Sequence, residues 1–540
     1  MAETMQQLLA ERTAHTGLAV LHNDTDGRQT RWTWREYLDR AARHAAALID
    51  RADTARPVHI GALLGNTPAM LTALAGAALG GYVLCGVNST RRGSALIGDL
   101  RTADAQILLV DAEHSGLLAD LRPDLDLAGI TVIDVDDPAW EQQCAGAGEL
   151  QPHRQVAPLD PFMLIFTSGT SGDPKAVLVS HFMVLVAGQS LTERFELGGD
   201  DVVYLSMPLF HSNAIAAGFG PAVAAGAAMA PAKFSASRFL ADVRGYGATY
   251  MNYVGKPFAY LLAHPEQHDD ADNPLRVAFG NEASERDIGE FARRFGVHVV
   301  DAFGSTENAV TITRDEGTPP GSVGRGFPGV AIYKDDPIAE CPPAVFDEHG
   351  ALSNAEEAIG ELVNTAGSGF FTGYYNNEQA TADRMRDGMY WSGDLAYKDA
   401  DGWIYLAGRT ADWMRVDGEN LAAAPIERIL MRHNAINQAA VYAVPDGNVG
   451  DQVMAALVLR DNARLSEAEF SDFLAAQEDL SPKAWPRYVR LTAELPATAT
   501  NKILKRVLAA ERTDVGTDTL WVRPDRQRTY RTATTTGASR

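Results

Sequence analysis

Short runs of β-forming residues alternate with helical segments along the first third of the chain. The runs lie at residues 58–64, 82–87, 107–112 and 131–135, and a candidate buried strand follows at 161–166. Residues 30–51 carry apolar side chains at helical spacing after a polar start. Strands that alternate with helices form parallel sheets with helices packed on their faces. We therefore predict an α/β fold, with a large N-terminal body of parallel and mixed sheets and flanking helices.

The length of 540 residues exceeds what one core usually organises, so we expect at least two domains. A domain boundary is indicated near Gly408–Asp412, because a new, short alternation of helix and strands begins after it. This pattern has a helix around Ala424–His433 and strands at 439–444 and 452–459. The predicted parts are a large N-terminal body at 1–408, a hinge at 409–412, a small mobile α+β C-terminal domain at 413–512, and a polar, partly disordered tail at 513–540.

The acidic balance of the chain narrows the class of partner. Its 47 Lys and Arg residues stand against 70 Asp and Glu residues, a formal net charge of −23. Binding to a nucleic-acid backbone or to anionic lipid depends on clustered basic side chains. We therefore expect no nucleic-acid partner and no lipid surface as the main anchor.

The cysteines and the hydropathy of the chain indicate the cellular compartment of the protein. Cys85, Cys144 and Cys341 lie far apart and form no CxxC pair, which favours reduced, packed thiols. The uncharged stretch Ala214–Ala232 is rich in Ala and Gly and contains two prolines, so we interpret it as a buried helix and turn rather than a membrane span. The first residues lack the basic start and apolar core of a signal peptide. We expect a soluble, cytoplasmic enzyme without a transmembrane segment.

The strongest chemical signal is the string TSGTSGDPK at residues 167–175, directly after the candidate strand at 161–166. Glycines let backbone N–H groups approach phosphate oxygens, hydroxyl groups donate further hydrogen bonds, and Lys175 supplies positive charge. The spacing differs from that of a Walker A loop. Taken alone, such a string is also typical of a surface turn.

Other motifs give this string a context. It resembles the phosphate loop of the superfamily of acyl-CoA synthetases, peptide-synthetase adenylation domains and luciferases. Further motifs of that superfamily follow in order: FGSTE at 303–307, YWSGD at 390–394, GR at 408–409 and NKILKR at 501–506. Each motif alone has a plain structural reading, but all five in order favour the superfamily. The resemblance covers about residues 20 to 510 and also implies a distorted barrel in the N-terminal body.

The resemblance assigns roles to individual residues. Those expected to bind ATP or CoA are Thr167, Ser168, Gly169, Thr170, Ser171, Gly172, Lys175, Gly280, Asn281, Glu282, Phe303, Gly304, Thr306, Asp394, Arg409, Gly418 and Glu419. The expected catalytic residues are Lys175, His211, Thr306, Glu307 and Lys502, and those expected to hold Mg²⁺ are Glu307 and Thr170. The expected substrate residues are His211, Asn213, Tyr253, Lys256 and Gly304.

The implied chemistry needs these residue types. When a carboxylate attacks the α-phosphorus of ATP, two anions meet, so catalysis rests on positioning and charge neutralisation. Lys175, Lys502 and Mg²⁺ held by Glu307 would supply the positive charge, and the ionised nucleophile needs no general base. In the second half-reaction a thiol would attack the adenylate, with the C-terminal domain turned and the loop Arg415–Ala422 facing the site.

Several strings resemble the fatty-acid-transport-protein-like, very-long-chain acyl-CoA synthetases and their actinobacterial relatives: MPLFHSNA at 207–214, MNYVGKPFAYLL at 251–262, VAFGNEAS at 277–284 and DWMRVDGENLAAAPIE at 412–427. The pattern departs from most of the superfamily at the adenine loop, where Asn281 and Glu282 replace Gly and Ala. It also departs at the hinge, where Ala411 offers no side chain to stabilise either domain orientation. Lys256 could serve an anionic or polar substrate group, or point to solvent.

Four functions are compatible with this reading. The first is an ATP-dependent ligase that makes an acyl-AMP from a fatty or aromatic acid and transfers the acyl group to CoA. The second is a diazotase that activates nitrite and couples it to an aromatic amine in natural-product biosynthesis. The third loads a free-standing carrier protein, and the fourth is an inactive scaffold, which the retained Lys175, Glu307, Asp394, Arg409 and Lys502 argue against. We expect ATP, Mg²⁺ and CoA or another acceptor as cofactors, and leave a homodimer open.

Overall fold

The computed structural model describes residues 2–24, 27–167, 174–314, 317–348, 350, 352–409, 413–416, 419–445, 451–497, 503–524 and 527–533. The chain divides into two compact units, which we describe separately. Unit 1 comprises residues 1–309 and 368–386, and unit 2 comprises residues 310–367 and 387–540.

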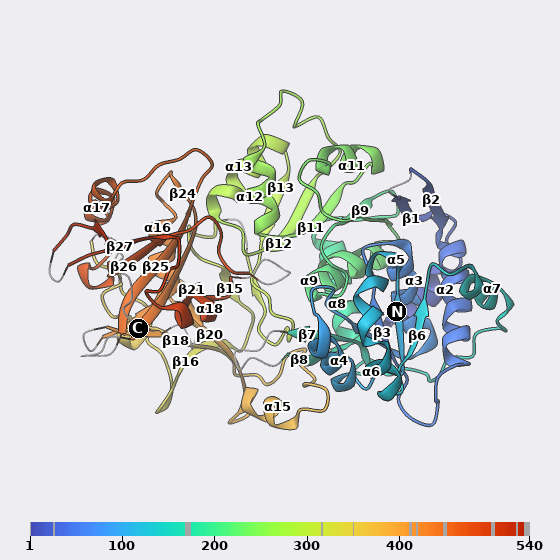
Figure 1. The fold of residues 1–540 in the computed structure, drawn as a ribbon. Helices are drawn as coiled ribbons and strands as arrows, with labels where there is room; N and C mark the ends of the chain where they lie inside the picture. Colours follow the sequence, from blue (N-terminus) through green and yellow to red (C-terminus); the bar gives the residue numbers. More distant parts are fainter. Residues whose placement is uncertain are drawn as a thin grey trace. The chain divides into compact units, whose positions relative to one another are not determined.

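A six-stranded sheet forms the first layer of unit 1 (Figure 1). Its order is β6 (Thr131–Asp134), β5 (Ile107–Val110), β3 (His59–Leu63), β4 (Val83–Gly86), β7 (Pro161–Thr167) and β8 (Lys175–Ser180). Neighbouring strands are parallel except β7 and β8, which are antiparallel. Strands β3, β4 and β5 are buried along their whole length, as expected for a sheet covered on both faces. The alternating strands predicted from the sequence are thereby confirmed.

A seven-stranded sheet forms the second layer of unit 1. Its order is β13 (His298–Asp301), β12 (Val277–Asn281), β11 (Tyr250–Val254), β9 (Val202–Leu205), β10 (Ala228–Pro231), β1 (Leu18–Asn23) and β2 (Gln29–Thr33). All neighbours pair in parallel except β1 and β2. The carboxyl ends of β11, β12 and β13 therefore meet at one edge of the sheet, which is where parallel sheets commonly carry ligand sites.

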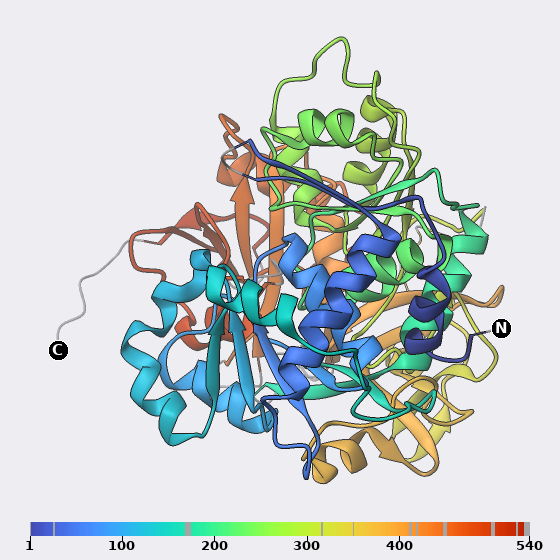
Figure 2. The same ribbon diagram turned by 90° about the vertical axis from the view of Figure 1, so that its right-hand side faces the viewer.

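Helices cover these sheets. They are α1 (Met5–Arg12), α2 (Trp34–Ile49), α3 (Pro68–Gly80), α4 (Gly93–Thr102), α5 (Ala112–Ser115), α6 (Arg122–Leu127), α7 (Pro138–Gly146), α8 (His181–Arg194), α9 (Ser212–Ala214), α10 (Gly220–Ala225), α11 (Phe239–Tyr246), α12 (Lys256–Ala263), α13 (Glu285–Phe295) and α15 (Glu378–Arg384), with a 3₁₀ turn at Gly116–Leu121. Helix α2 begins at a capping box in which Thr33 and Glu36 satisfy each other's backbone N–H groups. It lies beside α3, as Figure 2 shows. The predicted helix at 30–51 is thus confirmed from Trp34 onward, because the preceding residues pair as β2.

The apolar stretch Ala214–Ala232 is buried in unit 1. After α9 it forms a π-helix (Ile215–Phe219), then α10 and strand β10. It therefore contributes the predicted buried helix and turn, followed by a strand. No helix among the described residues combines the length and apolar character needed to cross a membrane. Cys85, Cys144 and Cys341 are all free and buried, as predicted.

Unit 2 begins with an antiparallel sheet. Its order is β14 (Ile312–Thr313), β15 (Gly324–Gly326), β21 (Trp403–Arg409), β20 (Met389–Lys398), β18 (Gly360–Asn364), β16 (Val330–Asp335) and β17 (Ile338–Glu340). The distorted barrel expected from the resemblance is not found, because no closed barrel forms among the described strands. The end strands β14 and β17 have two and three residues, β17 is exposed throughout, and the two do not pair with each other in the described part of the chain.

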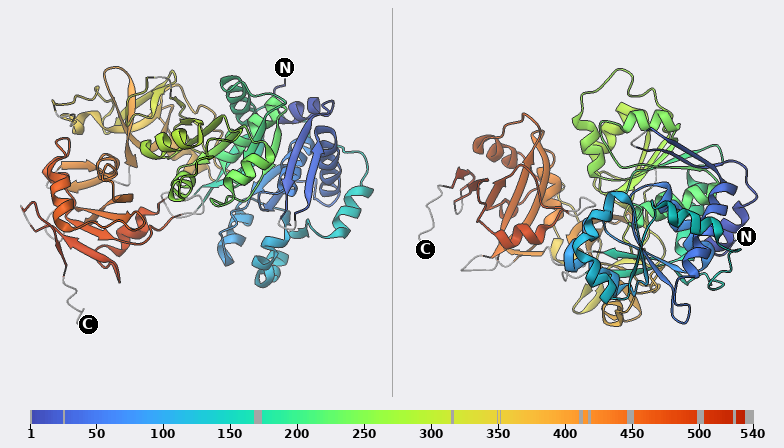
Figure 3. Two further views of the ribbon diagram at one scale, coloured as in Figure 1. Left: turned by 90° about the horizontal axis from the view of Figure 1, so that it is seen from above. Right: turned by 45° about the vertical axis from the view of Figure 1, so that its right-hand side comes forward.

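The rest of unit 2 is a five-stranded sheet with helices, drawn in orange and red in Figure 3. Its strands are β24 (Ile436–Pro445), β25 (Asp451–Leu459), β26 (Tyr488–Leu491), β27 (Thr519–Val522) and β28 (Arg531–Thr532). The hairpin β22 (Trp413–Val416) and β23 (Glu419–Ala422) precedes helices α16 (Ala423–Leu430), α17 (Glu467–Ala475) and α18 (Lys505–Glu511), and α14 (Ala355–Ala358) and a 3₁₀ turn at Pro482–Ala484 complete the unit. Trp521 and Tyr530 are buried in its core.

The predicted domain boundaries stay a prediction. Hinge residues Thr410, Ala411 and Asp412 lie outside the described residues. Residues 387–409 and 310–367 cluster with the C-terminal residues in one compact unit.

Candidate active site

Strands β7 and β8 hold the two ends of the Gly/Ser/Thr string. Their antiparallel register places Thr167 opposite Lys175. Ser168, Gly169, Thr170, Ser171 and Gly172, which the sequence assigns to phosphate binding, lie outside the described residues. The Nζ of Lys175 lies 5.2 Å from the centroid of the Tyr374 ring. The strand pair thus anchors the string at both ends and places its lysine beside an aromatic ring.

The FGSTE motif follows β13 and contacts two other segments. The hydroxyl of Tyr374 donates a hydrogen bond to Oε1 of Glu307 at 2.7 Å. The Oγ1 of Thr306 lies 3.1 Å from Oγ of Ser212, which belongs to the MPLFHSNA string. Three predicted motifs, those around Lys175, Ser212 and Glu307, are therefore brought together in unit 1.

A chain of asparagines connects the predicted acyl and adenine residues. The Nδ2 of Asn213 donates to Oδ1 of Asn281 and to the carbonyl oxygen of Tyr253, both at 3.3 Å. Its Oδ1 accepts a hydrogen bond of 2.7 Å from Nδ2 of Asn252, which is fully buried. A change at Asn213 would therefore affect the side that the sequence assigns to adenine.

The adenine loop has tight backbone geometry. A Cβ at Gly280 would lie 2.1 Å from the carbonyl oxygen of Tyr253, so only glycine fits there. Glu282 has a φ of +65°, which is uncommon for a residue with a side chain, and that side chain is exposed. The carboxylate of Asp301 holds this loop, because its Oδ2 accepts from the backbone N–H of Ala283 at 3.1 Å.

Tyr253 belongs to the core of unit 1. Its side chain is 0% exposed, its ring stacks on Phe258 with centroids 4.1 Å apart, and its hydroxyl donates to Asp301 at 2.9 Å. Through Asp301 it supports the adenine loop. The predicted substrate contact of this side chain stays a prediction.

His211 precedes the short helix α9. Its ring lies 4.4 Å from that of Phe210, centroid to centroid. Its Nε2 is buried and has no hydrogen-bond partner among the described residues. Burial lowers the pKa of His211 to about 4, so the imidazole is neutral at pH 7. A neutral ring of this kind suits an apolar wall.

In unit 2, Asp394 and Arg409 form a pair across two strands. They are Cα partners in β20 and β21, and Nε of Arg409 lies 2.7 Å from Oδ1 of Asp394. The backbone N–H of Asp394 donates to Oγ of Ser392 at 3.0 Å, and that of Gly393 donates to Glu361 at 2.6 Å. The carboxylate predicted to bind ribose is therefore buried and held in one orientation.

Several predicted residues have no described side chain. Lys502 and Gly418 lie outside the described residues. Glu419 begins β23 and Lys256 begins α12, but their side chains are not among the described ones. Phe303 is half-buried and Gly304 exposed in the loop after β13.

The carboxylate of Glu307 fits Mg²⁺ delivered with a nucleotide. Mg²⁺ is usually held through one or two carboxylates together with substrate phosphates. Among the described residues no group of three or more His, Cys, Asp or Glu side chains could form a complete metal cage. Glu307, with one oxygen engaged by Tyr374, can offer the other to the ion.

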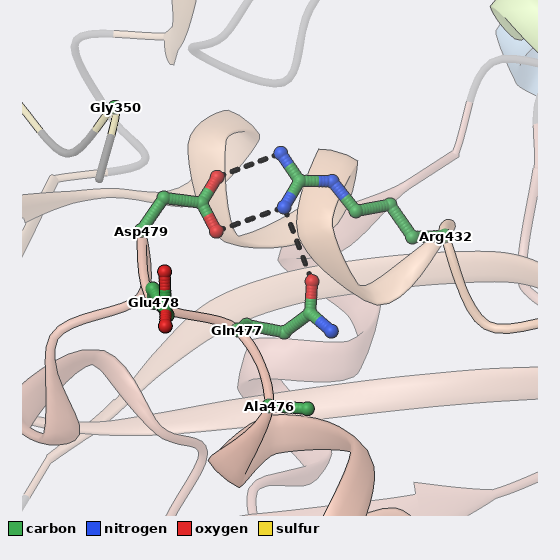
Figure 4. Close-up of a pocket in the computed structure, with 6 residues that line it drawn as sticks. All are labelled: Gly350, Arg432, Ala476, Gln477, Glu478 and Asp479. Atoms are coloured by element: carbon green, nitrogen blue, oxygen red, sulfur yellow. Dashed lines mark hydrogen bonds and ion pairs between the residues drawn. The ribbon is translucent and has the colours of Figure 1, made fainter. Parts of the chain in front are cut away.

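A separate hollow of about 480 Å³ lies in the C-terminal part of unit 2 (Figure 4). Arg432 forms a two-pronged ion pair with Asp479 across it and also donates to Gln477. Its six lining residues include none of the predicted site residues.

Comparison with known protein families shows the family to which this chain belongs. The AMP-binding enzyme model matches residues 8–375, and the AMP-binding enzyme C-terminal domain matches residues 425–502. The first match covers more than half of the chain. The chain belongs to the AMP-binding enzyme family. The superfamily resemblance of the sequence motifs is thereby confirmed.

Relatives within the AMP-binding enzyme family refine this placement. A medium/long-chain fatty-acid–CoA ligase of Mycobacterium tuberculosis is 52% identical over 481 residues, 89% of this chain and 91% of the relative. A steroid-22-oyl-CoA synthetase of Rhodococcus jostii is 45% identical over 514 residues, 94% and 91% of the two chains. The crystal structure of ATP-bound MatB from Rhodopseudomonas palustris superposes with a TM-score of 0.81 at 22% identity, covering 96% of this chain and all of that one.

As an AMP-binding enzyme with these relatives, the chain is an AMP-forming acid–thiol ligase. It activates a carboxylic acid with ATP and transfers the acyl group to CoA. The predicted enzyme class and the cofactors ATP, Mg²⁺ and CoA are confirmed.

Sequence reasoning missed two residues that contact the candidate site residues. Tyr374 contacts both Lys175 and Glu307, and Asp301 holds the adenine loop. The repeated tyrosine in GYYNN at 373–377 was the available signal for Tyr374, but a tyrosine in a loop-like string is usually structural. Asp301 could have been noticed as a carboxylate at the end of a strand.

Proposed function

We propose that the substrate is an apolar carboxylic acid, either a medium- or long-chain fatty acid or a steroid with a carboxylated side chain. The observation that carries this proposal is the 52% identity, over 89% of the chain, with the fatty-acid–CoA ligase of M. tuberculosis. The steroid-22-oyl-CoA synthetase, 45% identical over 94% of the chain, motivates the steroid alternative. Both named substrates present a large apolar body behind one carboxylate.

The buried segment Ala214–Ala232 supports an apolar substrate. It carries no charged residue and consists mostly of Ala and Gly. Burying apolar surface there would contribute about 25 cal/mol for each Å². A second charged group on the substrate would instead lose its hydration without compensation. We assign this segment, with the neutral His211 at its start, to the wall of the acyl site.

In the first half-reaction, an oxygen of the carboxylate attacks the α-phosphorus, and the bond to the bridging oxygen of pyrophosphate breaks. We propose that the ammonium of Lys175 neutralises negative charge on the departing phosphates. Thr306, oriented by Ser212, donates a hydrogen bond to a phosphate oxygen. Glu307 would hold Mg²⁺, which would supply further positive charge to the phosphates. Lys502, as predicted from the sequence, would polarise the carboxylate and the α-phosphate.

In the second half-reaction, the CoA sulfur attacks the acyl carbon and AMP leaves with the electrons of the broken C–O bond. We assign Asp394, held by Arg409, to the two ribose hydroxyls. The orientation that Arg409 fixes spares the carboxylate a reorganisation when the nucleotide binds. We further propose a reducing compartment, the cytoplasm, because all three cysteines are buried free thiols.

The experiment measures pyrophosphate release from ATP in parallel reactions. One arm supplies CoA with octanoate, palmitate, a steroid side-chain acid or benzoate, and the other supplies nitrite with aromatic amines. Release with the fatty or steroid acids, followed by thioester formation, supports the proposal and separates its two alternatives. Release only with benzoate, or only with nitrite and loss of the amine, overturns it, and the latter outcome assigns diazotisation. Lys502→Ala should abolish AMP formation while ATP still binds.

A further inference from the structure

We propose that Tyr374 is a positioning residue for the nucleotide phosphates, which holds Glu307 through its hydroxyl and Lys175 through its ring. The proposal rests on the proposed function, which assigns the phosphates and their Mg²⁺ to Lys175 and Glu307. It adds a residue that does not itself touch the reacting atoms. Its action would be to fix the two charged groups before the nucleotide arrives.

The backbone around Tyr374 is tied to the strand that begins with Lys175. The N–H of Leu178 donates to the carbonyl oxygen of Gly373 at 3.1 Å, and the N–H of Tyr375 donates to that of Ala176 at 2.8 Å. Between these bonds, Tyr374 pairs with Val177 in an antiparallel bridge. Residues 373–375 thus run along β8 as an extra strand segment, which fixes where the Tyr374 ring lies.

The hydroxyl of Tyr374 has a defined direction. The side chain is buried, with 4% of the residue exposed, and its oxygen lies 2.7 Å from Oε1 of Glu307. Arg384, at the end of α15, also hydrogen-bonds this hydroxyl. Because arginine only donates, the tyrosine oxygen accepts from Arg384 and its single proton goes to Glu307. The Oγ1 of Thr381, on the same helix, accepts from the backbone N–H of Tyr374 at 3.0 Å.

These contacts would prepare both charged groups for the nucleotide. A carboxylate fixed by an outer hydrogen bond presents its remaining lone pairs in one orientation, and such outer partners typically change metal affinity about 10–100-fold. The ring beside Lys175 attracts the ammonium from 5.2 Å without neutralising it. The lysine therefore stays in place and keeps its charge for a phosphate.

The test compares Tyr374→Phe with Tyr375→Phe. The first change removes one hydroxyl and keeps the ring beside Lys175. The second makes the same chemical change one residue along, where the ring packs on His59 with centroids 4.9 Å apart. Two measurements follow: binding of Mn²⁺ in the presence of the α,β-methylene analogue of ATP, by electron paramagnetic resonance, and acid-dependent ATP–pyrophosphate exchange as a function of Mg²⁺.

We expect Tyr374→Phe to weaken Mn²⁺ binding about tenfold and to raise the Mg²⁺ needed for half-maximal exchange by a similar factor. Tyr375→Phe should stay within about twofold of the wild type on the same scale. In a Glu307→Gln background, Tyr374→Phe should cause no further loss, because its partner carboxylate is gone. Thermal unfolding of both variants, measured alongside, shows whether each is folded.

Two results would overturn the inference. One is Mn²⁺ binding by folded Tyr374→Phe that matches that of Tyr375→Phe. The other is a loss of Mn²⁺ affinity on Tyr374→Phe that is equally large in the wild-type and the Glu307→Gln background. If the wild type exchanges and Glu307→Gln abolishes ion binding while Tyr374→Phe leaves ion binding unchanged, this inference fails and the proposed function stands. If the wild type exchanges with no acid at all, both fail.

Discussion

The ion pair between Arg294 and Asp270 offers a test of the energetics of unit 1. Nε of Arg294, in α13, donates to Oδ2 of Asp270 at 2.5 Å, and the two side chains are only 6% and 2% exposed. The same guanidinium donates to the carbonyl oxygens of His264 at 2.7 Å and Pro265 at 3.1 Å. It therefore holds the connection from α12 to β12 against α13.

The neighbouring residue provides the control. Arg293 pairs with Glu266 at 2.7 Å, but these side chains are 58% and 52% exposed. Removing one partner of a buried pair leaves the other charge without compensation and costs about 3–5 kcal/mol. An exposed pair is worth less than about 1 kcal/mol. Arg294→Met should therefore lower the free energy of unfolding by about 3–5 kcal/mol, and Arg293→Met by less than about 1 kcal/mol.

The pH dependence of this penalty gives a second readout. Burial raises the pKa of Asp270, but the N–H of Gln267 and the Arg294 guanidinium outweigh it and hold that pKa below its usual value. Without Arg294, the buried carboxylate will protonate more readily. The difference in stability between wild type and Arg294→Met should therefore shrink as the pH falls below the unfolded pKa of an aspartate.

Urea unfolding at matched pH, followed by circular dichroism and tryptophan fluorescence, measures both variants against the wild type. Limited proteolysis adds a local readout, since Arg294→Met should expose the connection at residues 264–273 to cleavage. Equal losses of stability in the two variants would refute the reasoning. So would a difference that does not change with pH.

Three further predictions address other sites. Burial lowers the pKa of His181 to about 4, so the native state stays neutral where the unfolded state binds a proton, and stability is lost as the pH falls from 6.5 to 4. The difference in unfolding free energy between wild type and His181→Leu should change by about 3 kcal/mol over that range in denaturation series; parallel curves would contradict this. Asp394→Asn should raise the KM for ATP about tenfold, since a charged hydrogen bond is worth about 1.5–3 kcal/mol; an unchanged KM would remove its ribose role. Gly280→Ala would place a methyl group 2.1 Å from a backbone oxygen and should lower Tm markedly, whereas Gly289→Ala, with open space around it in α13, should raise or preserve it; equal Tm values would show that the loop yields.

The fold of unit 1 could be predicted because its strands are short and its periodicity changes along the chain. The strand at residues 59–63, for example, is apolar after His59 and is followed by a proline-initiated helix. The absence of a closed barrel among the described strands of unit 2 could not be predicted in this way. Whether a sheet closes depends on pairing between its end strands, and β14 and β17 carry too few residues for any sequence pattern to reveal their partners.

The candidate site likewise contains residues that the sequence reveals and residues that it does not. Lys175 and Glu307 could be found because each lies in a contiguous motif. Tyr374 could not, since its hydrogen bond joins residues 67 positions apart and depends on the register between residues 373–375 and β8. The asparagine chain through Asn213 was hidden for a similar reason, because its members lie on three separate segments.

The π-helix at Ile215–Phe219 gives the acyl wall a means of variation that needs no substitution. Helix α10, which follows the π-helix, is held where Gly220 packs against Gly188, since a Cβ at Gly188 would lie 2.6 Å from the backbone of Gly220. Deleting one residue of the π-helix would restore α-helical spacing and turn the preceding residues, Asn213 among them, by about 100° around the helix axis. Where this segment lines the acyl site, as proposed above, a single insertion or deletion in a lineage would replace the side chains that face the substrate, and segment length would set acid preference as much as residue identity.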